Sequence, residues 1–208
     1  MRKAIIAGNW KMNKTPAEAA KLVTALKPLV KGANCDVVVC VPAVDIAAVK
    51  EAAKGSNIHV GAQNVHFAAS GAYTGELSAE MLVQSGVEYV IIGHSERRQY
   101  FGETDATVNQ RVLAAVKAGL KVILCVGEKL EDREAGYTDA LVEYQTLIAL
   151  TGLDKKQVAQ IIIAYEPVWA IGTGKTATDE QANETIGVIR AAICRKYGKE
   201  VKELVMDS

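Results

Sequence analysis

The sequence predicts a parallel α/β fold in which short buried strands alternate with helices. Six β-branched runs recur along the chain, and a helical stretch follows each of them. Because these runs are continuously apolar and do not alternate with polar residues, they suit strands buried on both faces of a parallel sheet. In chain order the predicted strands are residues 4–7, 36–41, 58–63, 89–93, 121–126 and 161–165.

The stretches between the strands have recognisable helix starts. After the first strand, Thr15-Pro16-Ala17-Glu18 combines a capping threonine, a proline at the first helical position and a glutamate at the third. After the sixth strand, Thr178-Asp179-Glu180-Gln181 repeats the capping box with glutamine and opens a helix predicted over residues 179–197. No linker, low-complexity segment or Gly/Ser stretch separates the units, so we expect a single domain over residues 1–208.

The composition fits a soluble globular protein. Half of the 208 residues are apolar and 23% are charged, which suffices for one sizeable core. Lys plus Arg equals Asp plus Glu, at 24 each, so no net field attracts nucleic acid or an anionic membrane. The apolar run near the amino terminus is too short for a signal sequence, and no segment approaches transmembrane length. We therefore expect a cytoplasmic protein that binds neither nucleic acid nor membrane.

The cysteines and glycines give no sign of a metal or a dinucleotide. Cys35, Cys40, Cys125 and Cys194 are scattered rather than spaced as C-x-x-C, so we predict reduced core residues. No H-x-x-x-H, carboxylate cluster or G-x-G-x-x-G is present. We expect neither cofactor nor metal.

Polar residues stand where the predicted strands stop. Asn9 and Lys11 follow the first strand, His94 follows the fourth and Glu166 follows the sixth. Periodicity alone leaves a doubly wound sheet and a barrel as alternatives. The ends of strands one, four and six converge only if the sheet closes into a barrel, so this placement favours the barrel.

Residues 165–175, from the end of the sixth strand onward, are typical of a carboxylate beside a movable lid. Pro167 fixes the backbone directly after Glu166, while Gly172 and Gly174 offer N–H groups that no side chain shields. Such groups can close over a phosphate. A carboxylate under a closing lid indicates proton transfer in a site kept free of water.

Four motifs, in this order and spacing, closely resemble the triosephosphate isomerase family. They are residues 8–13, 61–64, 93–98 and 165–175, and the resemblance is collinear from residue 1 to about residue 200. It implies a TIM (β/α)₈-type barrel without cofactor or metal. The implied reaction interconverts dihydroxyacetone phosphate and D-glyceraldehyde 3-phosphate through an enediol(ate), in glycolysis and gluconeogenesis.

The resemblance also implies a role for each polar residue. Glu166 is the general base, and His94 polarises the substrate carbonyl as a neutral imidazole, a neutrality that comes from the known pattern of this family and not from the sequence. Lys11 holds the substrate's negative charge and Asn9 adds a hydrogen bond. We expect Glu96 to orient Lys11. The Gly172 N–H binds phosphate when the lid, residues 167–178, closes.

A long glycine-containing loop around Thr74 resembles the loop that inserts into a neighbouring subunit. By this resemblance Thr74 reaches the partner's site, which implies a homodimer; a mobile surface loop is the alternative. His59 and His66 lack comparable context, so we expect both to be structural.

The chain departs from the family at its carboxyl end. A complete barrel has about 250 residues, so this chain is roughly 40 short. We expect about six strand-helix units, with the seventh and eighth strands and their glycine-rich phosphate loops missing. A truncated, catalytically silent fragment that acts only by association is therefore the alternative function. The third possibility is another barrel enzyme that acts on sugar phosphates. The set of Asn9, Lys11, His94 and Glu166 argues against it.

Overall fold

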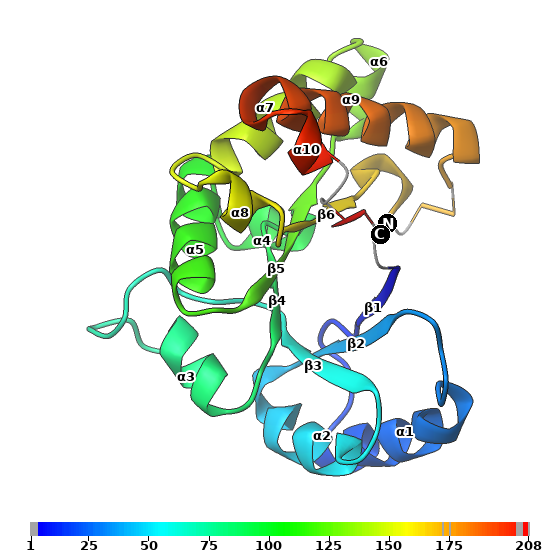
Figure 1. The fold of residues 1–208 in the computed structure, drawn as a ribbon, viewed down its shortest axis with the longest axis vertical. Helices are drawn as coiled ribbons and strands as arrows, with labels where there is room; N and C mark the ends of the chain where they lie inside the picture. The colour runs from blue at the N-terminus through cyan, green and yellow to red at the C-terminus, as the bar shows by residue number, and fades with distance from the viewer. Residues whose placement is uncertain (1–3, 172, 175, 203–205, 208) are drawn as a thin grey trace.

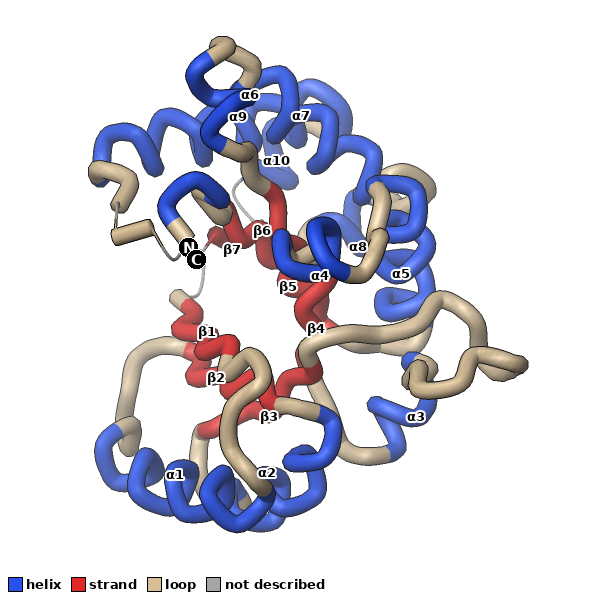
Figure 2. Tube along the Cα trace, turned by 180° about the vertical axis from the view of Figure 1, so that it is seen from behind, coloured by secondary structure: helices blue, strands red, loops and turns tan. Residues whose placement is uncertain are grey.

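The computed structural model describes residues 4–171, 173–174, 176–202 and 206–207, and within them the sheet is parallel throughout. Each strand pairs with the next one along the chain, in the order β1 to β7. The sheet curls around a central axis with the helices outside it (Figures 1 and 2). The strands are β1 (Ile5–Asn9), β2 (Asp36–Val41), β3 (Ile58–Ala62), β4 (Tyr89–Ile92), β5 (Lys121–Val126), β6 (Ile162–Tyr165) and β7 (Met206–Asp207).

Helices follow the strands as the sequence predicts. Both predicted capping boxes form: Glu18 accepts a hydrogen bond from the N–H of Thr15 at 2.8 Å, and Gln181 accepts one from Thr178 at 3.0 Å. The helices are α1 (Pro16–Leu29), α2 (Ile46–Ala53), α3 (Ala79–Gln84), α4 (Ser95–Tyr100), α5 (Asp105–Lys117), α6 (Leu130–Glu134), α7 (Thr138–Ala149), α8 (Lys155–Val158), α9 (Asp179–Tyr197) and α10 (Lys199–Lys202), with 3₁₀ turns η1 (Ala43–Asp45) and η2 (Val168–Ala170).

The strands differ from the prediction mainly at their ends. β1 runs on to Asn9, which is therefore the last residue of the strand rather than a residue beyond it. The six predicted strands form, and the chain adds the first two residues of a seventh, because Met206 and Asp207 pair in parallel with Ile162 and Ile163. The chain returns to the sheet after α10, and this short strand begins at the free edge of β6.

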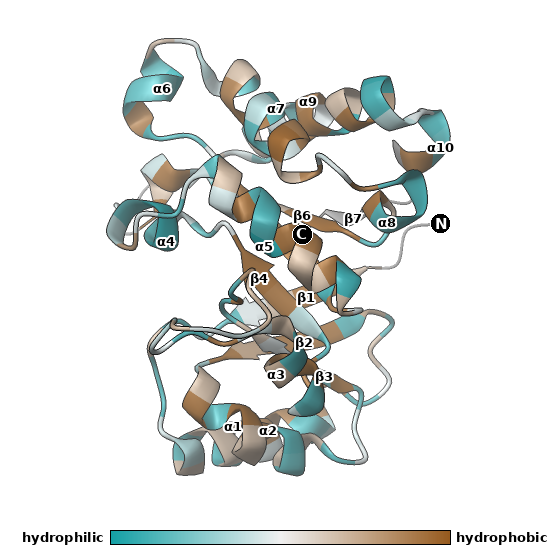
Figure 3. Ribbon diagram, turned by 90° about the vertical axis from the view of Figure 1, so that its left-hand side faces the viewer, coloured by the Kyte–Doolittle hydropathy of each residue, from teal (hydrophilic) through white to brown (hydrophobic). Residues whose placement is uncertain are grey.

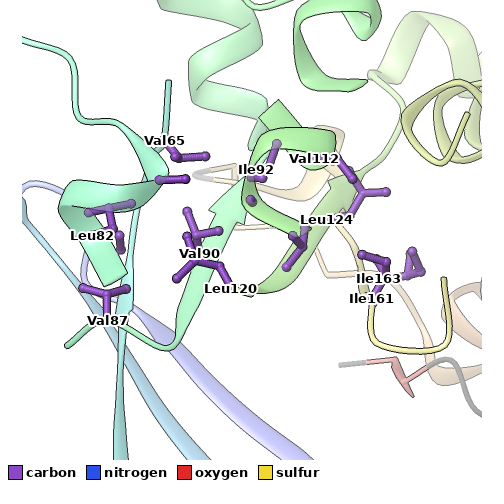
Figure 4. Close-up of a cluster of buried hydrophobic side chains, with 14 of the residues drawn as sticks. Val65, Leu82, Val87, Val90, Ile92, Val112, Leu120, Leu124, Ile161 and Ile163 are labelled. Atoms are coloured by element: carbon purple, nitrogen blue, oxygen red, sulfur yellow. The ribbon is translucent and has the colours of Figure 1, made fainter. Parts of the chain in front are cut away.

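The continuously apolar strands serve two separate cores. Along β2, the side chains of Val37, Val39 and Val41 pack outward against the helices, while Val38 and Cys40 point into the curled sheet. Figure 4 shows part of the outer core, with side chains from β4, β5, α5 and neighbouring segments in contact. Apolar colour runs along the strands, and the helices carry it on part of their surface (Figure 3).

All four cysteines are free thiols. Cys40 and Cys125 are buried inside the curl, as expected. Cys35 and Cys194 are partly exposed; Cys35 still packs against the outer core, so the prediction of core residues fails for Cys194. Cys35 lies just before β2 and Cys194 near the end of α9.

The described part of the sheet is open. β1 pairs with β2 alone and β7 with β6 alone, and no pairing between β1 and β7 is found among the described residues. On the outward face of β1, Ile6 is 65% exposed, whereas Ile5 on the inner face is 5% exposed. The outward face of β1 is thus apolar, and no helix in the described part of the chain covers it.

Candidate active site

The curl brings three of the predicted functional side chains to one end of the sheet. Lys11 follows β1, His94 follows β4 as the residue before α4, and Glu166 follows β6. Because the strands are parallel, their carboxyl ends lie at the same end of the curled sheet. The contacts described below show that residues 71 or more positions apart meet there.

Glu166 lies against His94, with 3.0 Å between its Oε1 and the imidazole Nε2. Its other oxygen, Oε2, accepts a hydrogen bond from the Ser95 N–H at 3.1 Å. Burial by itself would raise the pKa of Glu166, but the hydrogen bonds from His94 and Ser95 outweigh it and lower the pKa. The buried Cys125 thiol also bonds to the carboxyl group and lowers the pKa further. The side chain, 17% exposed, is therefore an ionised carboxylate held by donors.

The hydrogen bonds of His94 fix which of its nitrogens carries the proton. The N–H of Glu96, in the first turn of α4, donates to Nδ1 at 3.2 Å. Nδ1 must offer a lone pair to accept this bond, so in this arrangement the proton is on Nε2, which faces Glu166. His94 can thus donate a hydrogen bond from the same nitrogen that faces the carboxylate.

Gly127 allows the Glu166 backbone to lie where it does. The N–H of Glu166 donates to the Val126 carbonyl at 2.8 Å, which holds its main chain against the end of β5. A Cβ at position 127 would lie 1.7 Å from the Glu166 carbonyl oxygen. Only glycine fits this contact, because any side chain would displace the carboxylate-bearing segment.

Lys11 is held in an unusual conformation beside this pair. Its φ angle of 53° is in the left-handed region, and its Nζ lies 2.7 Å from Glu96 Oε1. The Gln63 side chain donates to the Lys11 carbonyl at 2.9 Å and to the Cys40 carbonyl at 3.0 Å. Asn9 Oδ1 accepts from the Lys11 N–H at 3.0 Å. These contacts offset the strain of the positive φ angle.

Lys11 is partly buried, although the residue after it is not. The Lys11 side chain is 41% exposed, whereas Met12 is 95% exposed. The Glu96 carboxylate, and not an apolar cover, is what orients the ammonium group.

A cavity of about 310 Å³ opens beside Lys11. This is large enough for a small ligand. Glu166 does not contribute to its wall; it lies behind His94. The cavity's polar lining residues are Asn9, Lys11, Gln63, Asn64, His94, Glu96 and Arg97.

The start of the lid is anchored on Glu128, a residue that the sequence analysis did not single out. Its carboxylate is fully buried and accepts hydrogen bonds from the Tyr165 hydroxyl at 2.9 Å, Trp169 Nε1 at 2.9 Å and Arg133 Nη1 at 3.1 Å. The Arg133 guanidinium also stacks 4.9 Å from the Trp169 ring centre. A glutamate two residues past the end of a predicted strand, in the region where other strands are followed by polar residues, was the available signal. Gly172 lies outside the described residues.

The structure leaves Thr74 apart from the other predicted site residues. Thr74 is exposed on the loop between β3 and α3 and does not line the cavity. The neighbouring Gly75 does line it. The loop projects from the side of the molecule in Figure 1.

The two other histidines have structural contacts. His59 Nδ1 lies 2.7 Å from Glu88, and His66 accepts a hydrogen bond from the Ala68 N–H while its ring stacks on Phe67. Among the described residues, no group of three or more His, Cys, Asp or Glu side chains is arranged to hold a metal ion. In the same part of the chain we find no helix with the length and apolarity to cross a membrane.

A carboxylate, an imidazole and a lysine gathered at the carboxyl ends of parallel strands define an acid–base enzyme of the α/β-barrel class. The chain belongs to the triosephosphate isomerase family, whose sequence profile matches residues 4–206.

Curated relatives agree with this assignment. The chain is 61% identical over 205 residues to a triosephosphate isomerase of Clostridium botulinum (strain ATCC 19397 / Type A), covering 99% of this chain and 83% of the relative. It is 62% identical over 204 residues to one of Acetivibrio thermocellus, covering 98% and 81%. A third, from Clostridium beijerinckii, is 59% identical over 203 residues, covering 98% and 82%.

Proposed function

We propose that Glu166, His94 and Lys11 carry out in this chain the reaction of its family, the interconversion of dihydroxyacetone phosphate and D-glyceraldehyde 3-phosphate. This aldose–ketose isomerisation belongs to glycolysis and gluconeogenesis. The observation that carries the assignment of roles is the 3.0 Å contact of Glu166 with His94 Nε2, beside the cavity that Lys11 lines.

Glu166 acts as the general base. Isomerisation requires one group to take a proton from a carbon and return it to the adjacent carbon. The lowered pKa of Glu166 keeps it ionised at neutral pH. The groups that donate hydrogen bonds to it, such as His94 and the Ser95 N–H, can be replaced by substrate hydroxyl groups.

His94 acts on the substrate oxygens. With Nδ1 bonded to the Glu96 N–H, the proton on Nε2 is free to be donated to a carbonyl once substrate separates the imidazole from Glu166. The donated hydrogen bond stabilises the developing enediolate. This use of a neutral imidazole is the pattern already known for the family.

Lys11 and Asn9 bind the substrate. The Lys11 ammonium supplies a fixed positive charge for the phosphate and the enediolate, with Glu96 orienting it at 2.7 Å. Asn9 lines the same cavity and offers a neutral hydrogen bond. Closure of residues 167–178 excludes water, with the Gly172 N–H on the phosphate.

The chain forms one barrel-type domain that works as a cytoplasmic homodimer, with Thr74 of one subunit reaching the site of the other. Exposure of Thr74 supports this, because its side chain is free to contact a second copy. Changing Thr74 to Arg should then favour monomers in sedimentation experiments and lower activity at low protein concentration. An unchanged sedimentation coefficient would argue against a dimer through this loop.

The proposed roles are tested by a coupled assay of glyceraldehyde 3-phosphate isomerisation. The wild-type chain should be active and the Glu166→Gln variant should lose at least about 100-fold in turnover, since the amide cannot take a proton. Equal activity of the two chains would remove Glu166 from the role.

The open sheet favours one alternative, a catalytically silent fragment that acts by association. Two observations support it: among the described residues β1 is paired on one side only, and Ile6 on its outward face is 65% exposed. Size-exclusion chromatography and circular dichroism separate the two: an active enzyme requires cooperative folding at one defined size, and an inactive but folded chain of variable size supports the alternative.

A further inference from the structure

Arg111, on α5, contacts both ends of the loop that connects β3 to α3. Its side chain is 9% exposed, and its Nη1 donates to Asn64 Oδ1 at 2.9 Å and to the Val65 carbonyl. The same nitrogen lies 3.8 Å from Glu76 Oε2, at the far end of the loop. A single buried guanidinium therefore joins the start and the end of residues 64–78.

The two ends of the loop are also bound to each other beside Arg111. Asn64 Nδ2 donates to Glu76 Oε2 at 3.2 Å, and the His66 N–H donates to the Leu77 carbonyl at 2.7 Å. Arg111 binds both of these ends from α5. We call the two joined ends the base of the loop, so α5 fixes the base while the middle of the loop is exposed.

On its other side, Arg111 reaches the wall of the cavity through Glu103. Its Nε lies 3.5 Å from Glu103 Oε1, and that oxygen also accepts a hydrogen bond from Arg97 Nε. Glu103 is 2% exposed. Arg97 and Asn64 both line the cavity beside Lys11. One part of its wall is thus hydrogen-bonded to Arg111, and another is linked to it through the ion pair with Glu103.

We propose that Arg111 is a positioning residue for the isomerase reaction: it fixes the base of loop 64–78 and, through Glu103, Arg97, and so sets the shape of a substrate cavity that it does not itself line. The proposal rests on the proposed function of that cavity. Its consequence is that one buried cation governs both the order of the loop and the activity of the site.

The arrangement requires arginine. The planar guanidinium places Nη1 on Asn64 and Val65 while Nε faces Glu103, in directions that its rigid fork sets. A lysine ammonium is a single point at the end of a flexible stem and cannot serve both sides at once. Arg111→Lys therefore keeps the charge and removes the positioning.

The order of the loop can be measured separately from activity, by limited chymotrypsin digestion of the native protein at a concentration low enough that sedimentation shows a monomer. Tyr73 in the loop is 45% exposed, and Tyr137, on the α6–α7 turn, is 63% exposed and serves as an internal reference. Release of the loop base raises cleavage at Tyr73 alone. Global destabilisation raises cleavage at both sites.

For Arg111→Lys we expect the ratio of cleavage at Tyr73 to cleavage at Tyr137 to rise at least about tenfold, the effect of losing one buried charged hydrogen bond. We expect kcat/KM to fall by a similar factor, about tenfold, because the cavity wall is no longer fixed. Arg195→Lys is the matched control: Arg195 is paired with Glu143 on the surface, is 59% exposed, and should leave both quantities unchanged.

Should Arg111→Lys fail to fold, Glu76→Gln serves in its place. Its amide oxygen still accepts from Asn64, but the charge facing Arg111 is lost, and the side chain, 30% exposed, lies near the surface. We expect a smaller rise in the same cleavage ratio.

Cleavage that rises equally at Tyr73 and Tyr137, or a ratio and a kcat/KM equal to those of wild type, would overturn the positioning role. An inactive wild-type chain would overturn the proposed function instead. The cleavage ratio would then decide by itself whether Arg111 fixes the loop.

Discussion

Two of the donors that hold Glu166, His94 and Ser95, have positions that suit a carboxylate of one length. His94 Nε2 and the Ser95 N–H lie 3.0 Å and 3.1 Å from its two oxygens. Replacing Glu166 with aspartate withdraws both oxygens by about one methylene and leaves the backbone unchanged. Because misplacement by about 1 Å can cost about 100-fold in rate, we expect turnover to fall by that order and KM to change little.

Steady-state kinetics of Glu166→Asp check this expectation. Glu131→Asp is the control, since Glu131 is exposed on α6. Unchanged turnover in a folded Glu166→Asp protein would mean that the base is another residue.

The four thiols should differ in reactivity because the tertiary structure places them differently. Burial raises the pKa of Cys40 to about 12 and that of Cys125 well above its usual value. The thiolate is the reactive form, so both stay protonated at pH 8. In the native protein, iodoacetamide should modify Cys35 and Cys194, which are partly exposed, and leave the other two intact.

Mass spectrometry of peptides, before and after unfolding in guanidinium, checks this order of reactivity. Rapid native modification of Cys40 or Cys125 would contradict the buried inner core.

At the scale of the element, the 3₁₀ turn η2 at the start of the lid is attached to the barrel through Glu128. Its carboxylate accepts from Tyr165, Trp169 and Arg133, and burial together with its charge raises the pKa of Tyr165 to about 12. Removing the charge leaves these donors with a poorer acceptor. For Glu128→Gln we expect a loss of about 1–3 kcal/mol in the free energy of unfolding, and a more mobile Trp169.

Urea unfolding and the fluorescence of Trp169, measured with Trp10 replaced by phenylalanine, test this anchor. Glu131→Gln on the exposed face of α6 should change stability by less than about 0.5 kcal/mol. If Glu128→Gln behaved like that control, the lid would not depend on this contact.

At the scale of the molecule, the outer side of β1 is an exposed apolar strand. Ile6 is 65% exposed and β1 is paired on one side only among the described residues. Such an edge favours pairing with other chains. At protein concentrations well above those of the activity and size measurements, we expect the 208-residue chain to form species larger than the dimer, and Ile6→Lys to suppress them.

Sedimentation velocity over a range of concentrations measures this association. Leu29→Lys is the matched control, because Leu29 is 80% exposed at the end of α1, away from the sheet edge. Equal suppression by both variants would show that general surface polarity, and not the edge, limits association.

Much of the fold and part of the site followed from local sequence. β2, β5 and α9 occupy their predicted residues, and both capping boxes form, because strand burial, caps and helix starts depend on neighbours within a few positions. The polar residues after strands β4 and β6 were equally visible. Their roles remain predictions that the kinetic experiments address.

The sequence by itself determined the order of strands and helices, the parallel sheet and the strand ends where polar groups stand, since each is set by short-range periodicity and turn chemistry. The tertiary structure alone decided which distant groups meet. The Gln63 side chain donates to the Lys11 carbonyl, Glu128 accepts from Trp169, and Arg111 donates to Asn64 at the base of the loop. These contacts span 41 to 52 positions, and no local pattern encodes them. They arise because the curl of the sheet brings separate strand ends and helices to the same place.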